Sequence, residues 1–90
     1  MVCVTKELII QNRLGLHARA AAQFVQLANQ FSCEIFIEKN GEEVNGKSIM
    51  GILMLAAPKG TPITLRLDGD DAQDALSALQ KLVDDKFGED

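Results

Sequence analysis

The sequence has no tryptophan and no tyrosine, and only four phenylalanines in 90 residues. Proteins that bind RNA or single-stranded DNA usually stack bases on aromatic side chains, and proteins that bind the phosphate backbone usually carry a basic patch. Here nine Lys and Arg residues are scattered among 13 Asp and Glu residues, which gives a net charge of −4. We therefore expect no nucleic-acid partner.

Cysteine and histidine are also scarce. Cys3 and Cys33 are too few and too far apart for a zinc knuckle or a redox C-x-x-C motif, so we expect two reduced thiols at strand positions. The single histidine, His17, has no Cys, Asp or Glu at ligand spacing. The sequence therefore predicts no metal site and no cofactor.

Long apolar runs are absent. The longest one, residues 49–57, is far too short to span a bilayer. Residues 1–7 lack the basic start and the long apolar stretch of a signal peptide. We therefore expect a cytoplasmic protein without membrane insertion. A hydrophobic content of 47% and a charged content of 24% are typical of one globular domain over residues 1–90, for which a monomer is the default.

Strand and helix patterns alternate along the chain. Apolar periodicity and turn residues predict strands at residues 4–10, 33–39, 42–44 and 62–68, with a tight hairpin at Asn40-Gly41. Helical periodicity predicts helices at residues 18–30, 48–55 and 72–87. The order β-α-β-β-α-β-α indicates an α+β fold in which helices cover one face of a four-stranded, mostly antiparallel sheet.

Two of the helices have predicted caps. Ser48 is expected to be the N-cap of the short helix, and Gly69-Asp70-Asp71 to supply a turn and an acidic cap for the last one. The buried stripe of the last helix is expected to consist of Ala72, Ala75, Leu76, Leu79, Leu82 and Val83.

His17 lies where an extended segment gives way to a helix. The first N–H groups of a helix have no internal partner and form an anion site, so the amides of Ala18 and Arg19 are expected to face bound phosphate. The Arg19 side chain adds a permanent positive charge, and a neutral imidazole is nucleophilic near pH 7. This pattern indicates phosphoryl chemistry on His17. Lone histidines are nevertheless often capping or surface residues, so composition alone leaves both interpretations open.

The segment Ile49 to Leu55 contains no polar residue. A small domain cannot easily bury such a helix on every side, so we expect part of Ile49, Met50, Leu53 and Met54 to form an exposed docking surface. A buried helix that merely packs fits the same pattern. A free-standing enzyme is poorly supported, because no second acid or base accompanies His17.

Two stretches together resemble the histidine-containing phosphocarrier protein (HPr) family of the bacterial phosphotransferase system. Gly15-Leu16-His17-Ala18-Arg19, followed by Ala21-Ala22-Gln23-Phe24-Val25, is similar to the active-site signature of that family. Asn45-Gly46-Lys47-Ser48-Ile49-Met50-Gly51 is similar to its regulatory-serine segment. The resemblance covers essentially the whole chain and implies an open-faced β-sandwich, with four antiparallel strands under three helices.

The resemblance also implies roles for individual residues. His17 would accept a phosphoryl group on Nδ1 from enzyme I, which takes it from phosphoenolpyruvate, and would pass it to phosphotransferase acceptor proteins. Arg19 would help to position and stabilise that group. Ser48 would be the target of an ATP-dependent serine kinase, with a phosphorylase as a further partner. Docking of partners is expected at Leu16, Ile49, Met50 and Leu53.

One position departs from the family pattern, because Ala20 stands where the family usually has proline. Proline at a helix start pre-sets φ. Alanine is therefore expected to leave the start of the helix less constrained, at a cost in stability of about 0.4–1 kcal/mol. Both a sugar-transport branch and a nitrogen-type branch of the family fit this sequence. The alternative function is a regulatory interaction module that acts mainly through Ser48 and the apolar helix.

Overall fold

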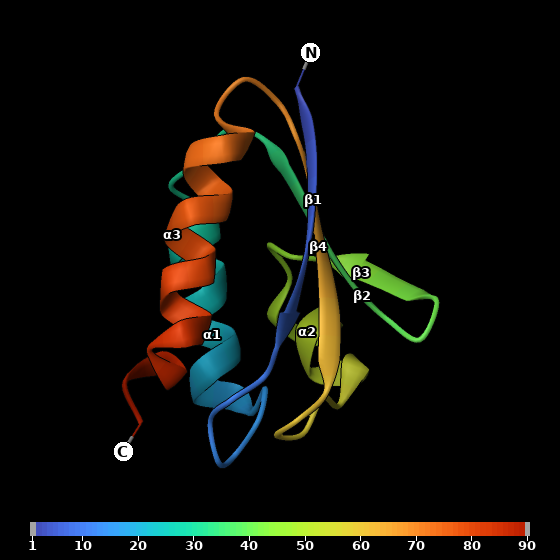
Figure 1. Cartoon of the computed structure of the whole chain (residues 1–90), viewed down its shortest axis with the longest axis vertical. Helices are drawn as coiled ribbons and strands as arrows, with labels where there is room; N and C mark the ends of the chain where they lie inside the picture. The colour runs from blue at the N-terminus through green and yellow to red at the C-terminus, as the bar shows by residue number, and fades with distance from the viewer. Residues whose placement is uncertain (1, 90) are drawn as a thin grey trace.

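The computed structural model describes residues 2–89 and has the predicted order of elements (Figure 1). Strands β1 (Cys3–Ile9), β2 (Glu34–Lys39), β3 (Glu42–Asn45) and β4 (Pro62–Asp68) form one antiparallel sheet in the order β1-β4-β2-β3. The helices are α1 (Ala18–Ala28), α2 (Ile49–Leu55) and α3 (Ala72–Asp84), followed by the 3-10 turn η1 (Lys86–Gly88). The predicted open-faced α+β architecture is confirmed.

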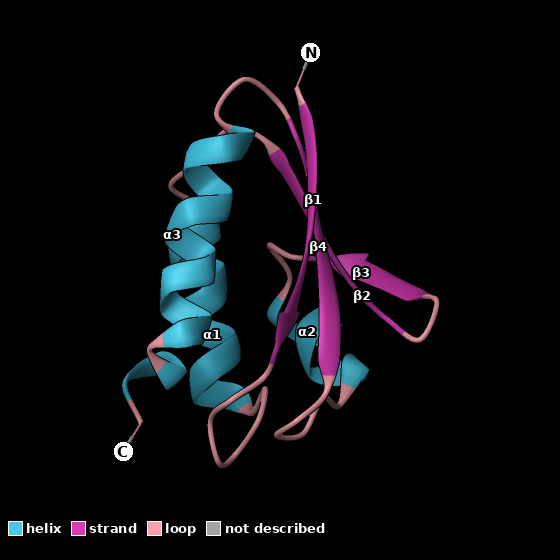
Figure 2. Ribbon diagram, in the orientation of Figure 1, coloured by secondary structure: helices cyan, strands magenta, loops and turns pink. Residues whose placement is uncertain are grey.

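The core lies between the sheet and the helices. Helices α1 and α3 run side by side along the sheet, while α2 packs against α1 and β3 (Figure 2). Alternate residues of the strands point into this layer, as the pairs Ile35–Leu67 and Ile37–Leu65 show. Phe24 of α1 and Leu79 of α3 are fully buried in the same core. No helix within residues 2–89 is long and apolar enough to cross a membrane.

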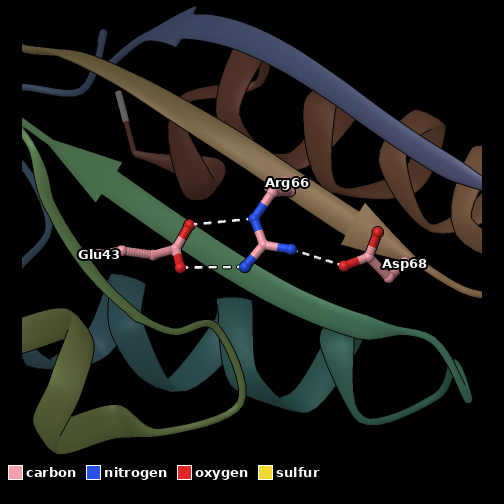
Figure 3. Close-up of polar contacts among 3 residues, drawn as sticks. All are labelled: Glu43, Arg66 and Asp68. Atoms are coloured by element: carbon pink, nitrogen blue, oxygen red, sulfur yellow. Dashed lines mark hydrogen bonds and ion pairs between the residues drawn. The ribbon is translucent and has the colours of Figure 1, made fainter.

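The opposite face of the sheet is open and carries a charged cluster around Arg66 (Figure 3). The Arg66 guanidinium donates two hydrogen bonds to Glu43 at 3.0 and 3.1 Å and a third to Asp68 at 2.6 Å. Its charge also lies 4.3 Å from the centre of the Phe36 ring. The hydrogen bonds from Arg66 lower the pKa of the Glu43 carboxyl. The cluster therefore ties β4 to β2 and β3 on the face that the helices leave uncovered.

The two long helices end earlier than their sequence patterns predict. Helix α1 ends at Ala28 and not at residue 30, because the amides of Gln30 and Phe31 turn back to the carbonyls of Leu27 and Ala28. Helix α3 ends at Asp84 and not at residue 87. Lys86 and Phe87 both take positive φ, and this turn places the Phe87 side chain in the core, where it is 3% exposed. The strand ends differ from the prediction by one residue or less.

Two predictions about α3 are wrong. Leu82 is only half-buried, at the edge of the stripe. Asp71 occupies the N-cap position, but its side chain makes no capping bond. It accepts hydrogen bonds from the amides of Ser32 and Cys33, at 2.8 and 2.9 Å, and so fastens the start of β2 to the start of α3. The Asp71 side chain thus makes these tertiary hydrogen bonds in place of a bond to the first amides of α3. Cys3 and Cys33 are both free thiols.

Candidate functional site

His17 occupies the N-cap position of α1, with extended backbone (φ −82°, ψ 179°). Its carbonyl accepts the first helical hydrogen bond, from the Ala21 amide at 2.8 Å. Its side chain makes no capping bond, which argues against the helix-capping interpretation. The imidazole is partly open to solvent, with 27% of the side chain exposed. His17 thus presents a ring at the protein surface beside a helix start.

The first turn of α1 offers unpaired amides beside this ring. Within residues 2–89, the N–H groups of Ala18, Arg19 and Ala20 have no backbone acceptor. No acidic side chain lies in this turn to compete for them. Ala20 contributes one more amide than a proline would, because proline has no N–H. The sequence predicted the amides of Ala18 and Arg19; the third follows from the departure at position 20.

Arg19 is exposed and forms no ion pair or hydrogen bond with another side chain of residues 2–89. Its guanidinium is therefore free to meet an anion at the surface. Ala20, by contrast, is fully buried on the core side of α1. The small side chains around His17 leave its ring accessible.

The loop before His17 is held against the segment that follows α2. The Leu16 amide donates to the Ala57 carbonyl at 2.9 Å, and the His17 amide donates to the Gly15 carbonyl at 2.9 Å. Gly15 takes φ +68°, and a Cβ added to it would lie 2.5 Å from the Ala57 oxygen. The close approach at Gly15 therefore sets where His17 sits relative to the end of α2.

A carboxylate that the sequence did not point to completes the site. Glu89 Oε2 lies 3.0 Å from His17 Nε2, and Asn12 Nδ2 donates to the same oxygen at 2.5 Å. Burial alone would raise the pKa of Glu89, but hydrogen bonds from Asn12 and His17 outweigh it, and the pKa is lowered. Glu89 is therefore an anion at neutral pH, held beside the imidazole.

Asn12 is the other residue that sequence reasoning missed. It is fully buried, and its Nδ2 also donates to the Gly15 carbonyl at 2.7 Å, so it links Glu89 to the loop that carries His17. A polar residue just after an apolar strand is an ordinary loop signal, and nothing in the sequence relates residue 12 to residue 89. The contact exists only in the folded chain.

Ser48 is the N-cap of α2, as predicted: its Oγ accepts a hydrogen bond from the Gly51 amide at 3.0 Å. Such a cap stabilises a helix by about 1 kcal/mol. The hydroxyl is half-buried, next to the apolar surface of α2. Helix α2 in turn contacts α1, the helix that begins beside His17.

The exposed apolar surface of α2 consists of Ile49, Met50 and Met54. Met50 and Met54 are 71% and 72% exposed, while Leu53 is half-buried and Ile52 lies in the core. Leu16, which we expected in the docking surface, is only 5% exposed, because its loop turns it into the core. Leu14, two residues earlier, is exposed in its place. An exposed apolar surface of this kind usually marks a partner site.

Other site types find little support in the described part of the chain. Residues 2–89 contain no group of three His, Cys, Asp or Glu residues that could hold a metal ion. A hollow of about 270 Å³ is lined by Ser32, Cys33 and residues 68–71. These residues lie at the turn between β4 and α3, at the end of the molecule far from the start of α1 (Figure 1). His17 does not line this hollow, and its ring is partly exposed at the start of α1.

Comparison with known proteins agrees with this geometry. The family model described as "PTS HPr component phosphorylation site" matches residues 4–85. The chain is 55% identical over 80 residues to the phosphocarrier protein HPr of Neisseria meningitidis. This match covers 89% of this chain and 90% of that protein. It is 49% identical over 81 residues to the HPr-like protein Crh of Halalkalibacterium halodurans, covering 90% and 96%.

A solved structure is similar throughout. The crystal structure of an HPr from Thermoanaerobacter tengcongensis has a TM-score of 0.91 and 48% identity, and covers 100% of this chain and 99% of that one. Sequence and fold therefore lead to the same conclusion: the chain belongs to the HPr family of phosphocarrier proteins of the bacterial phosphotransferase system.

Proposed function

We propose that His17 accepts a phosphoryl group on Nδ1 from enzyme I and passes it to phosphotransferase acceptor proteins. One observation carries the proposal: a partly exposed imidazole lies directly before three unpaired helix amides. In this proposal the protein acts in the cytoplasm, as a monomer and without a cofactor. It is a carrier that is regenerated at each transfer, and not a turnover enzyme.

The arrangement suits phosphoryl transfer, which depends mainly on position and on stabilisation of charge. The amides of Ala18, Arg19 and Ala20 would donate to the phosphoryl oxygens, and the positive end of the α1 dipole would stabilise their charge. The free Arg19 guanidinium would add a bidentate contact. The three amides are fixed by the backbone of α1 before phosphate arrives, so they need little reorganisation.

The test is direct phosphorylation. The chain is incubated with phosphoenolpyruvate and enzyme I, and phosphohistidine is followed by phosphorus NMR. We expect one acid-labile phosphoryl group per chain, and none when enzyme I is omitted. A wild-type chain that shows no phosphohistidine signal would contradict the proposal.

We further propose that enzyme I docks on the surface formed by Ile49, Met50 and Met54, with the half-buried Leu53 at its base. A Met50→Asp change is expected to weaken binding by about 2 kcal/mol, or roughly 30-fold in Kd, because it places a charge in the desolvated centre of the interface. Isothermal calorimetry measures the effect.

Ile9→Asp is the matched control for this change. Ile9 is an exposed apolar residue at the end of β1, the edge strand opposite β3, against which α2 packs, so the same charge there should leave Kd unchanged. Equal weakening by both variants, or by neither, would place the docking surface elsewhere.

A regulatory role for Ser48 is the second candidate function. Its hydroxyl lies at the start of the same helix that carries the exposed methionines. Phosphorylation by a serine kinase would add a charge of about −1.5 to −2 there, which the helix start tolerates but an acidic partner would not. Binding to a transcription regulator that changes in Ser48→Asp and persists in His17→Ala would favour this regulatory function over the carrier function.

A further inference from the structure

The contact between Glu89 and His17 is built by the turn that follows α3. Lys86, Phe87 and Gly88 all have positive φ, so the chain reverses its direction at this point. The buried Phe87 side chain anchors the turn in the core. Two residues later the Glu89 side chain reaches His17, with 16% of it exposed. The buried Phe87 thus fixes the backbone from which the Glu89 carboxylate extends to His17.

The chemistry of the two partners fixes the position of a proton. A carboxylate only accepts hydrogen bonds, and the pKa of Glu89 is lowered, so Glu89 is ionised. At 3.0 Å from Glu89 Oε2, the His17 Nε2 atom must therefore donate. In the neutral ring the second nitrogen, Nδ1, then carries no proton and presents a lone pair.

We propose that Glu89 is a positioning residue for the transfer: it holds the proton of His17 on Nε2, so that Nδ1 is the nucleophile, and it offsets the positive charge that the ring gains. This inference rests on the proposed phosphocarrier function. Asn12 in turn holds the Glu89 carboxylate in position, because its Nδ2 donates to the same carboxylate oxygen and to the Gly15 carbonyl.

The transfer step balances without any further group. The Nδ1 lone pair forms the bond to phosphorus, and the bond from phosphorus to the donor breaks, with its electron pair leaving on the donor. Nδ1 has no proton to lose, and Nε2 keeps its own. The ring therefore becomes cationic, next to the carboxylate at 3.0 Å. In the onward transfer the protonated ring is the better leaving group, so Glu89 assists both directions.

The first experiment uses the unphosphorylated protein. Long-range ¹H–¹⁵N NMR of His17 reports which ring nitrogen carries the proton. We expect the Nε2-protonated form alone in the wild type and a mixture of both neutral forms in Glu89→Ala. In Glu89→Gln the amide oxygen can still accept from His17 and Asn12, so this variant should keep the wild-type form. An Nδ1-protonated ring in the wild type, or an unchanged ring in Glu89→Ala, would overturn the inference.

The second experiment measures phosphoryl uptake from enzyme I in the same variants. Glu89→Gln should lower the maximal rate roughly five- to tenfold without a matching change in KM, because it keeps the hydrogen bond and loses the charge. Glu89→Ala should lower it further. Glu7→Gln removes a carboxylate from β1 and should leave the rate unchanged. A wild-type rate in Glu89→Ala would overturn the inference.

The two experiments separate this inference from the function beneath it. A wild-type chain that takes up no phosphoryl group contradicts the carrier function, whereas the protonation of His17 is measured without phosphate and stands or falls by itself.

Discussion

A His17→Ala chain is expected to take up no phosphoryl group from enzyme I, against full uptake by the wild type. His17 is the single histidine, so no second imidazole can replace it. Its removal should affect folding little, because the side chain is partly exposed and makes no capping bond, and Glu89 keeps its hydrogen bond from Asn12 when the His17 contact is lost. Surface substitutions of this kind shift Tm by no more than about 3 °C. Phosphorus NMR and a thermal melt of the same sample measure both effects.

Gln26→Ala is the control, because Gln26 is an exposed residue of α1 that makes no contact with the site. It should take up phosphate as the wild type does. An acid-labile signal that survives in His17→Ala would contradict the assignment of His17. An acid-stable signal would instead indicate a phosphoserine and favour Ser48.

The parts of this site that could be predicted from the sequence are those whose signals are local. A histidine at the change from strand to helix pattern places the imidazole beside free amides, whatever the rest of the chain does. Ser48 is an N-cap for the same reason, since the Gly51 amide that it binds lies only three residues away. The periods of the apolar residues likewise predicted the layers of the fold.

Glu89 and Asn12 could not be predicted in this way. Glu89 is separated from His17 by 72 residues, and the contact depends on a left-handed turn at Lys86 and Phe87. The periodicity of α3 runs on to Phe87, so it suggested a longer helix. The one signal against this was Gly88, because glycine is frequent just after a helix end and here has φ +76°. Without that turn, Glu89 would not reach the site.

The proposed docking surface shows the same limit on a smaller scale. Leu14 and Leu16 flank one glycine, and the sequence does not tell which of them faces the solvent. The left-handed backbone of Gly15 decides it: Leu16 is turned into the core and Leu14 outward. The expectation that Leu16 is exposed was therefore wrong for a conformational reason.

Gly15→Ala is expected to destabilise the fold by about 2–4 kcal/mol and to slow phosphoryl uptake by the chains that remain folded. Two costs add up at this position. The residue must keep φ +68°, which alone costs an L-residue about 1–2 kcal/mol. The new Cβ would also lie 2.5 Å from the Ala57 oxygen and 2.8 Å from Pro58 Cα. Both are backbone atoms, so the loop must move.

Gly41→Ala separates the two costs. Gly41 has φ +85° and nothing within 4 Å of an added Cβ, so only the backbone cost applies there. Chemical denaturation should show a loss of about 1 kcal/mol for Gly41→Ala and a clearly larger one for Gly15→Ala. Equal losses would mean that the approach to Ala57 does not constrain the loop.

The effect on phosphoryl uptake follows from what Gly15 holds in place. Its carbonyl accepts hydrogen bonds from the His17 amide and from Asn12 Nδ2, so a displaced Gly15 moves the imidazole and the partner of Glu89 together. Uptake should therefore fall in Gly15→Ala and stay normal in Gly41→Ala, even at temperatures where both chains are folded. Such a result would make one glycine responsible for both the anchoring of the loop and the aim of the histidine.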